Sequence, residues 1–383
     1  MKTNFDILAD RRDSDSIKWN LYDEDVLPLW VADTDFLSPS PVIKASKNRT
    51  DHGIFGYAES QESTKEAVRN WLLTRHNWQV TLEDIILLPG VVQGFNYAAK
   101  AFTNPGDSVL FHTPAYHPFF QVAGYSNLNQ ITTPLTLLAD NTYIVSQDKF
   151  VSSISPRTRL FIFCNPHNPT GMVFSKSELE LISQACLDHK IIICSDEIHS
   201  DLVFSGSKHI PIASLSKSVS DITITLVSPS KTFNLAGLKS SVAIITNPFL
   251  REQFIQSMSG FAGSVNLLGE TAMRAAYQFG ENWLDQLLRY LEINRDFLID
   301  YVMTQLPGIQ VNKPEGTYLC WLDCSETDLN DPAEFFLSQA RVALNSGSWF
   351  GEDYVHFARI NFGCPRERLF EGLERIRTSL TNR

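Results

Sequence analysis

The sequence predicts an α/β fold in which a parallel or mostly parallel sheet lies between helices, followed by a smaller α+β domain. The first observation is that short apolar runs alternate with helical patterns between about residues 61 and 245. Such alternation is typical of sheets that are covered on both faces. The second observation is that the alternation stops near residue 280, where a long helical pattern begins. The third is that polar residues and glycines follow the apolar runs, which is where parallel sheets bind ligands.

The composition is that of an ordinary folded chain. Its 383 residues are 43% apolar and 20% charged, which favours two to three domains. The net charge is −11 and no basic stripe occurs, so we expect no nucleic-acid partner. No apolar run reaches about 18 residues and no signal sequence is evident, so we expect no membrane partner. The six cysteines are expected to be reduced thiols, and we predict a cytoplasmic location.

The expected elements follow from periodicity and turn residues. A helix over 61–77 buries Ala67, Val68, Trp71 and Leu72 on one side. A second helix ends near residue 102, and a third begins behind the capping box of Ser175 and Glu178. Further helices are expected at 281–306 and 332–341, and none with assurance within residues 1–40. The expected strands cover residues 85–88, 108–112, 160–164, 191–194, 222–227, 241–245, 317–322 and 355–362.

Unusual residues follow five of these strands. They are Gly90, Tyr116, Asn168, Asp196 and Lys231. Because the carboxyl ends of parallel strands meet at one edge of a sheet, this shared placement predicts one site built from distant segments.

Lys231 is the residue in this set with the most direct chemical implication. It follows a buried run in the stretch Ser228-Pro229-Ser230-Lys231. A desolvated lysine has a lowered pKa and becomes a nucleophilic amine, which a Schiff base requires. The serines at a turn into a helix suit a phosphate. The alternative is a surface turn with a solvated lysine.

Arg359 is a second candidate, in the predicted small domain. It shares a strand face with Phe357 and Asn361. An arginine in this setting either pairs with a structural carboxylate or binds the carboxylate of a ligand, and the residues alone leave both open.

Taken together, these residues resemble the fold-type I pyridoxal-phosphate enzymes, the aspartate aminotransferase superfamily. The motifs that carry the resemblance occur in the family's order along nearly the whole chain. They are Asn168-Pro169-Thr170-Gly171, Asp196-Glu197, Ser228-x-Ser230-Lys231 and Arg359-x-Asn361. Other stretches are similar to the MalY/PatB branch, which consists mainly of cystathionine β-lyases, also called C–S lyases. These are Lys18-Trp19, residues 29–33, Asp35-Phe36, residues 114–116 and residues 164–171.

The resemblance implies a seven-stranded sheet and a division into three parts. Residues 1–45 would form an arm that contributes to the small domain and the active-site entrance. Residues 46–285 would form the large domain that binds pyridoxal 5'-phosphate, and residues 286–383 the small domain.

The resemblance also implies roles around that cofactor. Lys231 would carry it and act as general base, Asp196 would face its ring nitrogen, and Asn168 would donate to its phenolic oxygen. Without the resemblance, Asp196 is equally read as a helix cap, Asn168 as a turn residue and Tyr116 as one more aromatic. Tyr116 would stack on the ring and could protonate the leaving group, a role that Lys231 shares. The remaining cofactor ligands would be Gly90, Val91, Val92, His199, Ser228, Ser230 and Lys239, with Tyr57 from a neighbouring subunit.

Three further implications concern the substrate and the assembly. Arg359 would bind the α-carboxylate of an amino acid, together with Asn168 and the backbone near Ala32 and Asp33. The role of Tyr57 would make the protein a homodimer with shared sites. The sequence departs from the family at Lys239, where arginine is usual, and from the branch at Thr34, where methionine is usual near the substrate entrance.

The predicted reaction is β-elimination from L-cystathionine or a related sulfur amino acid, giving a thiol, pyruvate and ammonia. An aminotransferase is the main alternative, because the same cofactor residues serve both reactions. A non-catalytic regulator is the remote one, and the complete residue set argues against it. A Rossmann-type dehydrogenase is excluded by the absence of G-x-G-x-x-G after an early strand.

Overall fold

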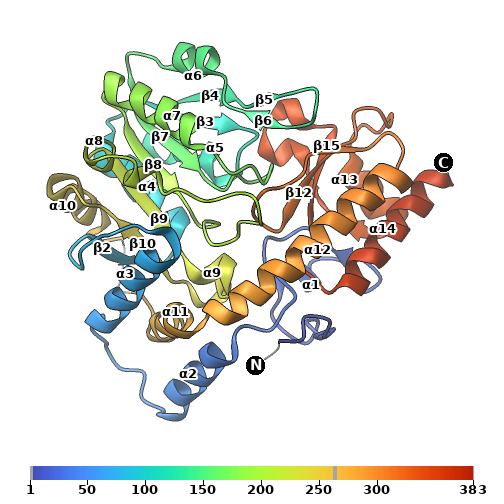
Figure 1. The fold of residues 1–383 in the computed structure, drawn as a ribbon, viewed down its shortest axis with the longest axis horizontal. Helices are drawn as coiled ribbons and strands as arrows, with labels where there is room; N and C mark the ends of the chain where they lie inside the picture. Colours follow the sequence, from blue (N-terminus) through green and yellow to red (C-terminus); the bar gives the residue numbers. More distant parts are fainter. Residues whose placement is uncertain (1–2, 262–264, 383) are drawn as a thin grey trace.

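A computed structural model describes residues 3–261 and 265–382, and its two larger sheets lie apart from each other (Figure 1). The larger sheet has seven strands in the order β2-β10-β9-β8-β7-β3-β4. Only β10 runs antiparallel to its neighbours, so the mostly parallel, seven-stranded prediction is confirmed. The strands are β2 (Ile85–Leu88), β3 (Ser108–Thr113), β4 (Asn129–Pro134), β7 (Thr158–Cys164), β8 (Ile192–Asp196), β9 (Thr223–Val227) and β10 (Ser241–Ile244).

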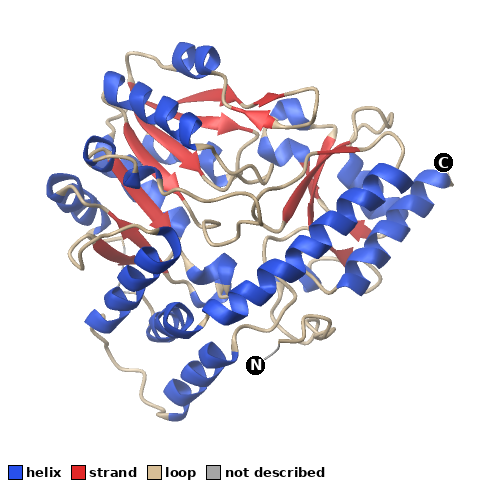
Figure 2. Cartoon of the chain, in the orientation of Figure 1, coloured by secondary structure: helices blue, strands red, loops and turns tan. Residues whose placement is uncertain are grey.

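The central strands of the large sheet are buried on both faces, and β7, β8 and β9 read as nearly continuous apolar runs, whereas the edge strand β4 is polar and mostly exposed. In β7, Leu160 and Ile162 pack on one face, and Phe161 and Phe163 on the other. Figure 2 shows the helices on the two sides of this sheet. One face is covered by α4 (Val91–Phe102), α5 (Pro118–Ser126) and α10 (Pro248–Met258). The other is covered by α6 (Gln147–Ser153), α7 (Lys176–His189) and α8 (Lys217–Ser220).

A four-stranded antiparallel sheet forms the core of the second region, in the order β11-β12-β15-β14. The long helix α12 (Glu281–Gln305) leads to it from the large sheet, as Figure 1 shows, and α14 (Arg366–Thr381) packs beside that helix. The strands are β11 (Gln310–Val311), β12 (Leu319–Asp323), β14 (Asn345–Ser346) and β15 (Phe357–Asn361), and α13 (Pro332–Phe335) follows β12.

The N-terminal segment belongs spatially to this second region. Its strand β1 (Leu27–Pro28) pairs in parallel with β13 (Val342–Ala343). Residues far apart in the sequence therefore form one wall of the molecule. The exact division into domains at residues 45 and 285 stays a prediction.

Most predicted elements are present within a few residues of their expected ends, including α3 (Glu62–His76) and the capping box before α7. The expectation of no helix up to residue 40 is wrong in detail, because α1 (Ile17–Asn20) lies there and α2 (Ser40–Asp51) begins at its end. Both are hard to detect, since α1 is one turn long and α2 buries only Val42. The helix expected after Ser228 is the single turn α9 (Pro229–Thr232). Several elements were not expected, among them the strand β4 and the helices α5, α6, α10, α11 (Leu267–Phe279) and α14. Within the described residues, no helix is both long and apolar enough to cross a membrane.

Candidate active site

A cavity of about 490 Å³ lies at the carboxyl ends of the large sheet's parallel strands. All five residues that follow strand ends in the sequence line it: Gly90, Tyr116, Asn168, Asp196 and Lys231. Arg359 reaches the same cavity from β15 of the small sheet. The prediction that these distant segments meet is confirmed by their position.

Lys231 lies in the single turn α9, which follows the buried strand β9 directly. Its Nζ donates a hydrogen bond of 2.6 Å to the carbonyl oxygen of Ala32. Burial lowers the pKa of Lys231 to about 8; the nearby Asp33 and Asp196 oppose this shift, and Arg359 and Lys239 add to it. The amine is therefore much easier to deprotonate than an ordinary lysine.

Asp196 ends β8 and is buried in the cavity wall. The backbone N–H of Ile198 donates to its Oδ1 over 3.1 Å, and no ion pair with it exists among the described residues. Burial raises the pKa of Asp196 to about 7, although Ile198 and Lys231 act in the opposite direction. A buried carboxylate that has no cationic partner can bind a positively charged atom of a ligand.

Arg359 is buried and contacts three neutral oxygens instead of a carboxylate. Its Nη1 donates to Asn168 Oδ1 over 2.9 Å, and its Nη2 donates to the carbonyl of Trp30 and to Asn345 Oδ1. Burial lowers its pKa to about 10. Three of the five N–H groups of the guanidinium are thus engaged, and Nε has no partner. Two N–H groups are left, one on Nε and one on Nη1.

Asn168 is placed by a tight loop behind β7. Gly171, three residues on, has a φ of +71°, and a Cβ there would lie 2.4 Å from Pro314 Cβ. Only glycine fits this approach of the loop to the small domain. Because Oδ1 of Asn168 accepts from Arg359, its Nδ2 group is left to donate into the cavity.

A group of N–H and hydroxyl donors lies at the opposite end of the cavity. Helix α4 begins there at Val91, so the first-turn N–H groups of Val91 and Val92 point toward it. Gly94 lets this helix approach the sheet, since a Cβ would lie 2.7 Å from Leu226 Cδ2. Ser228, Ser230, Lys239 and Ser240 complete the group. The buried Oγ of Ser240 has no hydrogen-bond partner.

Tyr116 and His199 line the middle of the cavity. Burial raises the pKa of Tyr116, and Asp196 adds to the shift, so its hydroxyl is protonated at neutral pH. Burial lowers the pKa of His199 well below its usual value, and its buried Nδ1 has no partner. Trp30 lines the cavity. It is also packed against its neighbours, since only 7% of its surface is exposed.

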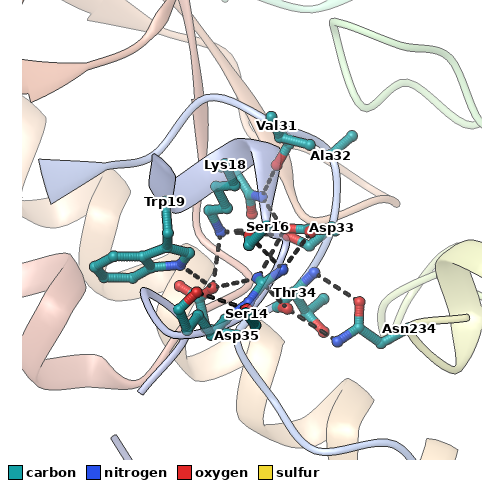
Figure 3. A network of polar contacts seen from close by, with 12 residues as sticks. Ser14, Ser16, Lys18, Trp19, Val31, Ala32, Asp33, Thr34, Asp35 and Asn234 are labelled. Carbon is teal, nitrogen blue, oxygen red and sulfur yellow. Dashed lines mark hydrogen bonds and ion pairs between the residues drawn. The ribbon is translucent and has the colours of Figure 1, made fainter. Parts of the chain in front are cut away.

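Residues Trp30, Val31 and Ala32 line one side of the cavity. The carboxylate of Asp33 lies on the other side of this segment, where it pairs with Arg11 (Figure 3). Thr34 is also turned away and only 1% exposed, so the expectation that it lies at the substrate entrance is wrong. The segment turns at Thr34 because its carbonyl and N–H both bind Asn234.

Besides Asp33, Tyr57 is a predicted site residue that this chain does not bring to the cavity. Its side chain is fully exposed in an extended segment between α2 and α3. Its predicted role involves another subunit and therefore stays a prediction.

Several cavity residues were not singled out from the sequence, among them Ser240, Asn345 and Trp349. Ser240 precedes β10, one residue after Lys239, so a scan of strand starts could have found it. Asn345 and Trp349 lie on or beside the two-residue strand β14, which has no detectable period.

The six cysteines are free and buried, as expected for core thiols. No group of three or more metal-ligating side chains occurs in the part of the chain that the structure describes. The site therefore rests on amines, carboxylates, hydroxyls and backbone N–H groups.

A mostly parallel seven-stranded sheet with a buried lysine and aspartate at its strand ends defines the class of fold-type I pyridoxal-phosphate enzymes. The family model for aminotransferase class I and II matches residues 24–376, and the chain belongs to that family.

The relatives with high similarity cover the whole chain. The chain is 40% identical to cystathionine beta-lyase PatB of Bacillus subtilis, over 99% of this chain and 100% of that protein. The crystal structure of OvoB superposes with a TM-score of 0.96 at 41% identity and covers 100% of both chains. Cystalysin from Treponema denticola, whose structure contains pyridoxal 5'-phosphate, has a TM-score of 0.96 at 33% identity, again over 100% of both chains. The resemblance to this branch is thereby confirmed.

Proposed function

We propose that the protein is a pyridoxal-phosphate-dependent C–S β-lyase that acts on L-cystathionine or a related sulfur amino acid. The observation that carries the proposal is the meeting of Lys231, Asp196, Asn168 and Arg359 in one cavity. The similarity to cystathionine beta-lyase PatB favours β-elimination over transamination.

The residues present fit the cofactor. Asp196 lacks a cationic partner, and Ser240 Oγ and His199 Nδ1 are buried donors or acceptors without a partner. The N-terminus of α4 and Lys239 supply the positive potential that a phosphate needs. Val91, Val92, Ser228, Ser230 and Lys239 would hold the phosphate, Asp196 the ring nitrogen, and Tyr116 the ring face. His199 would lie beside the ring.

Pyridoxal phosphate, when bound, supplies an electron sink for the bonds at the substrate Cα. Lys231 would hold it, and after the substrate amine has replaced Nζ on the cofactor, the freed Nζ would accept the Cα proton, which its lowered pKa permits near neutral pH. Asp196 keeps a proton on the ring nitrogen. Arg359 would bind the α-carboxylate, and Asn168, whose Oδ1 accepts from Arg359, would hold that guanidinium in place and donate to the ring oxygen through its Nδ2.

The departing sulfur requires a proton. Tyr116 holds one at neutral pH, and Lys231 holds the one taken from Cα. The Cα–H and Cβ–S bonds break, and the products after hydrolysis are a thiol, pyruvate and ammonia.

The decisive experiment incubates the purified protein with L-cystathionine and measures pyruvate and free thiol together. Equal release of both over many turnovers is the expected result. Absence of pyruvate, with cofactor absorbance that is lost on adding an amino acid and restored by a keto acid, would make the protein an aminotransferase. The variant Lys231→Ala is the matched control and is expected to be inactive while it still binds the cofactor.

We also propose that two copies assemble so that Tyr57 of each reaches the phosphate end of the other's cavity. Three apolar or aromatic side chains, Ile54, Phe55 and Tyr57, are exposed together on this segment. Mixing inactive Lys231→Ala with a weakly active Tyr57→Ala variant tests the arrangement. Mixed dimers contain one site with both native residues, so activity is expected to return. A fully active monomer in gel filtration would refute shared sites. The cytoplasmic location stays a prediction.

A further inference from the structure

The segment from Trp30 to Asp33 presents its carbonyl groups alternately to two sides. The carbonyls of Trp30 and Ala32 face the cavity and accept from Arg359 Nη2 at 2.9 Å and Lys231 Nζ at 2.6 Å. The carbonyls of Val31 and Asp33 face away and accept from Asn361 Nδ2 at 2.5 and 2.7 Å. Arg359 and Lys231 thus bind to a backbone segment that is itself held in place from the side away from the cavity.

Ion pairs of Asp33 with Arg11 and Lys18 hold this segment on the side away from the cavity, and Figure 3 shows Lys18 beside Asp33. Arg11 forms a fork with the carboxylate of Asp33, with Nη2–Oδ2 at 2.7 Å and Nη1–Oδ1 at 3.1 Å. The same guanidinium also donates to the carbonyl of Thr34 and to Asp35 Oδ1. Lys18 Nζ lies 3.6 Å from Asp33 Oδ1. Asp33 therefore joins the cavity wall to cationic side chains that do not line the cavity.

Asp33 has an electrostatic effect on the site as well as a mechanical one. The charged or titratable groups that face Lys231 are Asp33, Asp196, Arg359, Lys239 and His199. Asp33 is the one among them whose side chain does not line the cavity. Its charge favours the protonated amine and opposes the effect of burial on the pKa of Lys231. Arg11 reduces that charge, because it sits against the same carboxylate.

We propose that Arg11 and Asp33 are positioning residues, which place the Ala32 carbonyl against Lys231 and set the charge that the Lys231 amine experiences. The inference rests on the proposed function only in taking Lys231 as the working amine, and it holds for either reaction.

The opposite charges of the pair give a sharp test. Asp33→Asn removes a negative charge near the amine and leaves Arg11 and Lys18 with Asp35 as their remaining ion-pair partner, so the pKa of Lys231 is expected to fall by about one unit. Arg11→Gln leaves the Asp33 carboxylate less neutralised, so that pKa is expected to rise. The double variant is expected to return close to the parent value. Arg11→Lys keeps the charge but loses the fork and serves as the matched control, with little shift.

The measurement is competitive acetylation of the full-length protein after removal of the cofactor. Mass spectrometry follows labelling of Lys231 against pH, and circular dichroism verifies that each variant is folded. Shifts of opposite sign support the proposal. Shifts of the same sign, or none, would overturn it, because loss of a merely structural ion pair disturbs the segment in the same way from either end. If Arg11→Gln does not fold, the pKa of Lys231 is compared between Asp33→Asn and Arg11→Lys. A fall of that pKa in Asp33→Asn alone supports the proposal, and an equal shift in both variants overturns it. Because no turnover is measured, failure here and failure of the lyase assay are distinct.

Discussion

Two buried carboxylates, Asp35 and Asp196, lie in different regions of this molecule, and their pKa values are shifted in opposite directions. Asp35 is surrounded by Lys18 at 3.2 Å, Arg11 at 2.7 Å, Arg368 at 3.6 Å and the indole N–H of Trp19 at 3.0 Å. Burial alone would raise its pKa, but Lys18, Trp19 and Arg11 outweigh burial and lower it. Asp196 has one backbone N–H, and burial raises its pKa to about 7. A compensated carboxylate holds the fold together, whereas an uncompensated one is available to a cationic ligand.

The largest expected effect comes from replacing Asp35, the carboxylate that is surrounded by cations. Asp35→Asn leaves Lys18, Arg11 and Arg368 without their shared carboxylate in a buried site. Removal of one partner from a buried ionic cluster costs about 3–5 kcal/mol of unfolding free energy. Urea unfolding of the cofactor-free protein measures this loss. A change below about 1 kcal/mol would show that the cluster contributes little to stability.

The second prediction concerns Asp196, the carboxylate without a cationic partner. Asp196→Asn removes the charge that would hold a proton on the cofactor ring, so kcat/KM is expected to fall by about 10²- to 10³-fold. Stability of the cofactor-free protein is expected to stay equal or to rise, because the variant buries no charge. Steady-state kinetics and urea unfolding of the same preparation give both values. Activity within a few-fold of the parent would refute the role of Asp196.

The pH dependence of stability is expected to differ in sign between the two carboxylates. The pKa of Asp196 is raised from 3.8 to about 7, so the folded state binds its proton more tightly and loses stability as the pH rises across that interval. Asp196→Asn is therefore expected to gain on the parent by on the order of 2 kcal/mol between pH 4 and pH 7. The pKa of Asp35 is lowered, so its contribution is complete above pH 3.8 and is lost as the pH falls below that value. Urea titrations at several pH values measure both differences, and slopes of equal sign would contradict the comparison.

The smallest effect concerns a cation that resembles Asp196 in having no ionic partner. Lys239 is exposed at the cavity, and no carboxylate lies within ion-pair distance of it in the described ranges 3–261 and 265–382. Lys239→Ala is expected to weaken binding of pyridoxal phosphate by about tenfold, the value of one charged hydrogen bond. Lys239→Arg is the matched control and should keep the parent affinity within a few-fold. Equilibrium dialysis measures both, and equal affinity of the alanine variant would exclude a phosphate contact.

The sequence was sufficient for the parts of the site that follow a regular pattern. Asp196 and Lys231 could be found because each follows a continuous apolar strand, and strand ends meet at one edge. The partners that hold these residues could not be found in that way. Arg11 and Asp33 are 22 residues apart and lie in irregular segments, and Asn345 contacts Arg359 from a strand of two residues. Such contacts arise from tertiary packing, which leaves no period in the sequence.

The pairing of β1 with β13 has a consequence for the order in which the chain becomes functional. The seven strands of the large sheet pair only with one another and end at residue 244, and α10, which covers one face, ends at Met258, so Lys231 can reach its strand end early in synthesis. The Ala32 carbonyl is fixed only after β13, near residue 342, and Asn361 have left the ribosome. A nascent chain therefore carries its reactive amine for more than a hundred residues of translation before the wall that controls that amine exists.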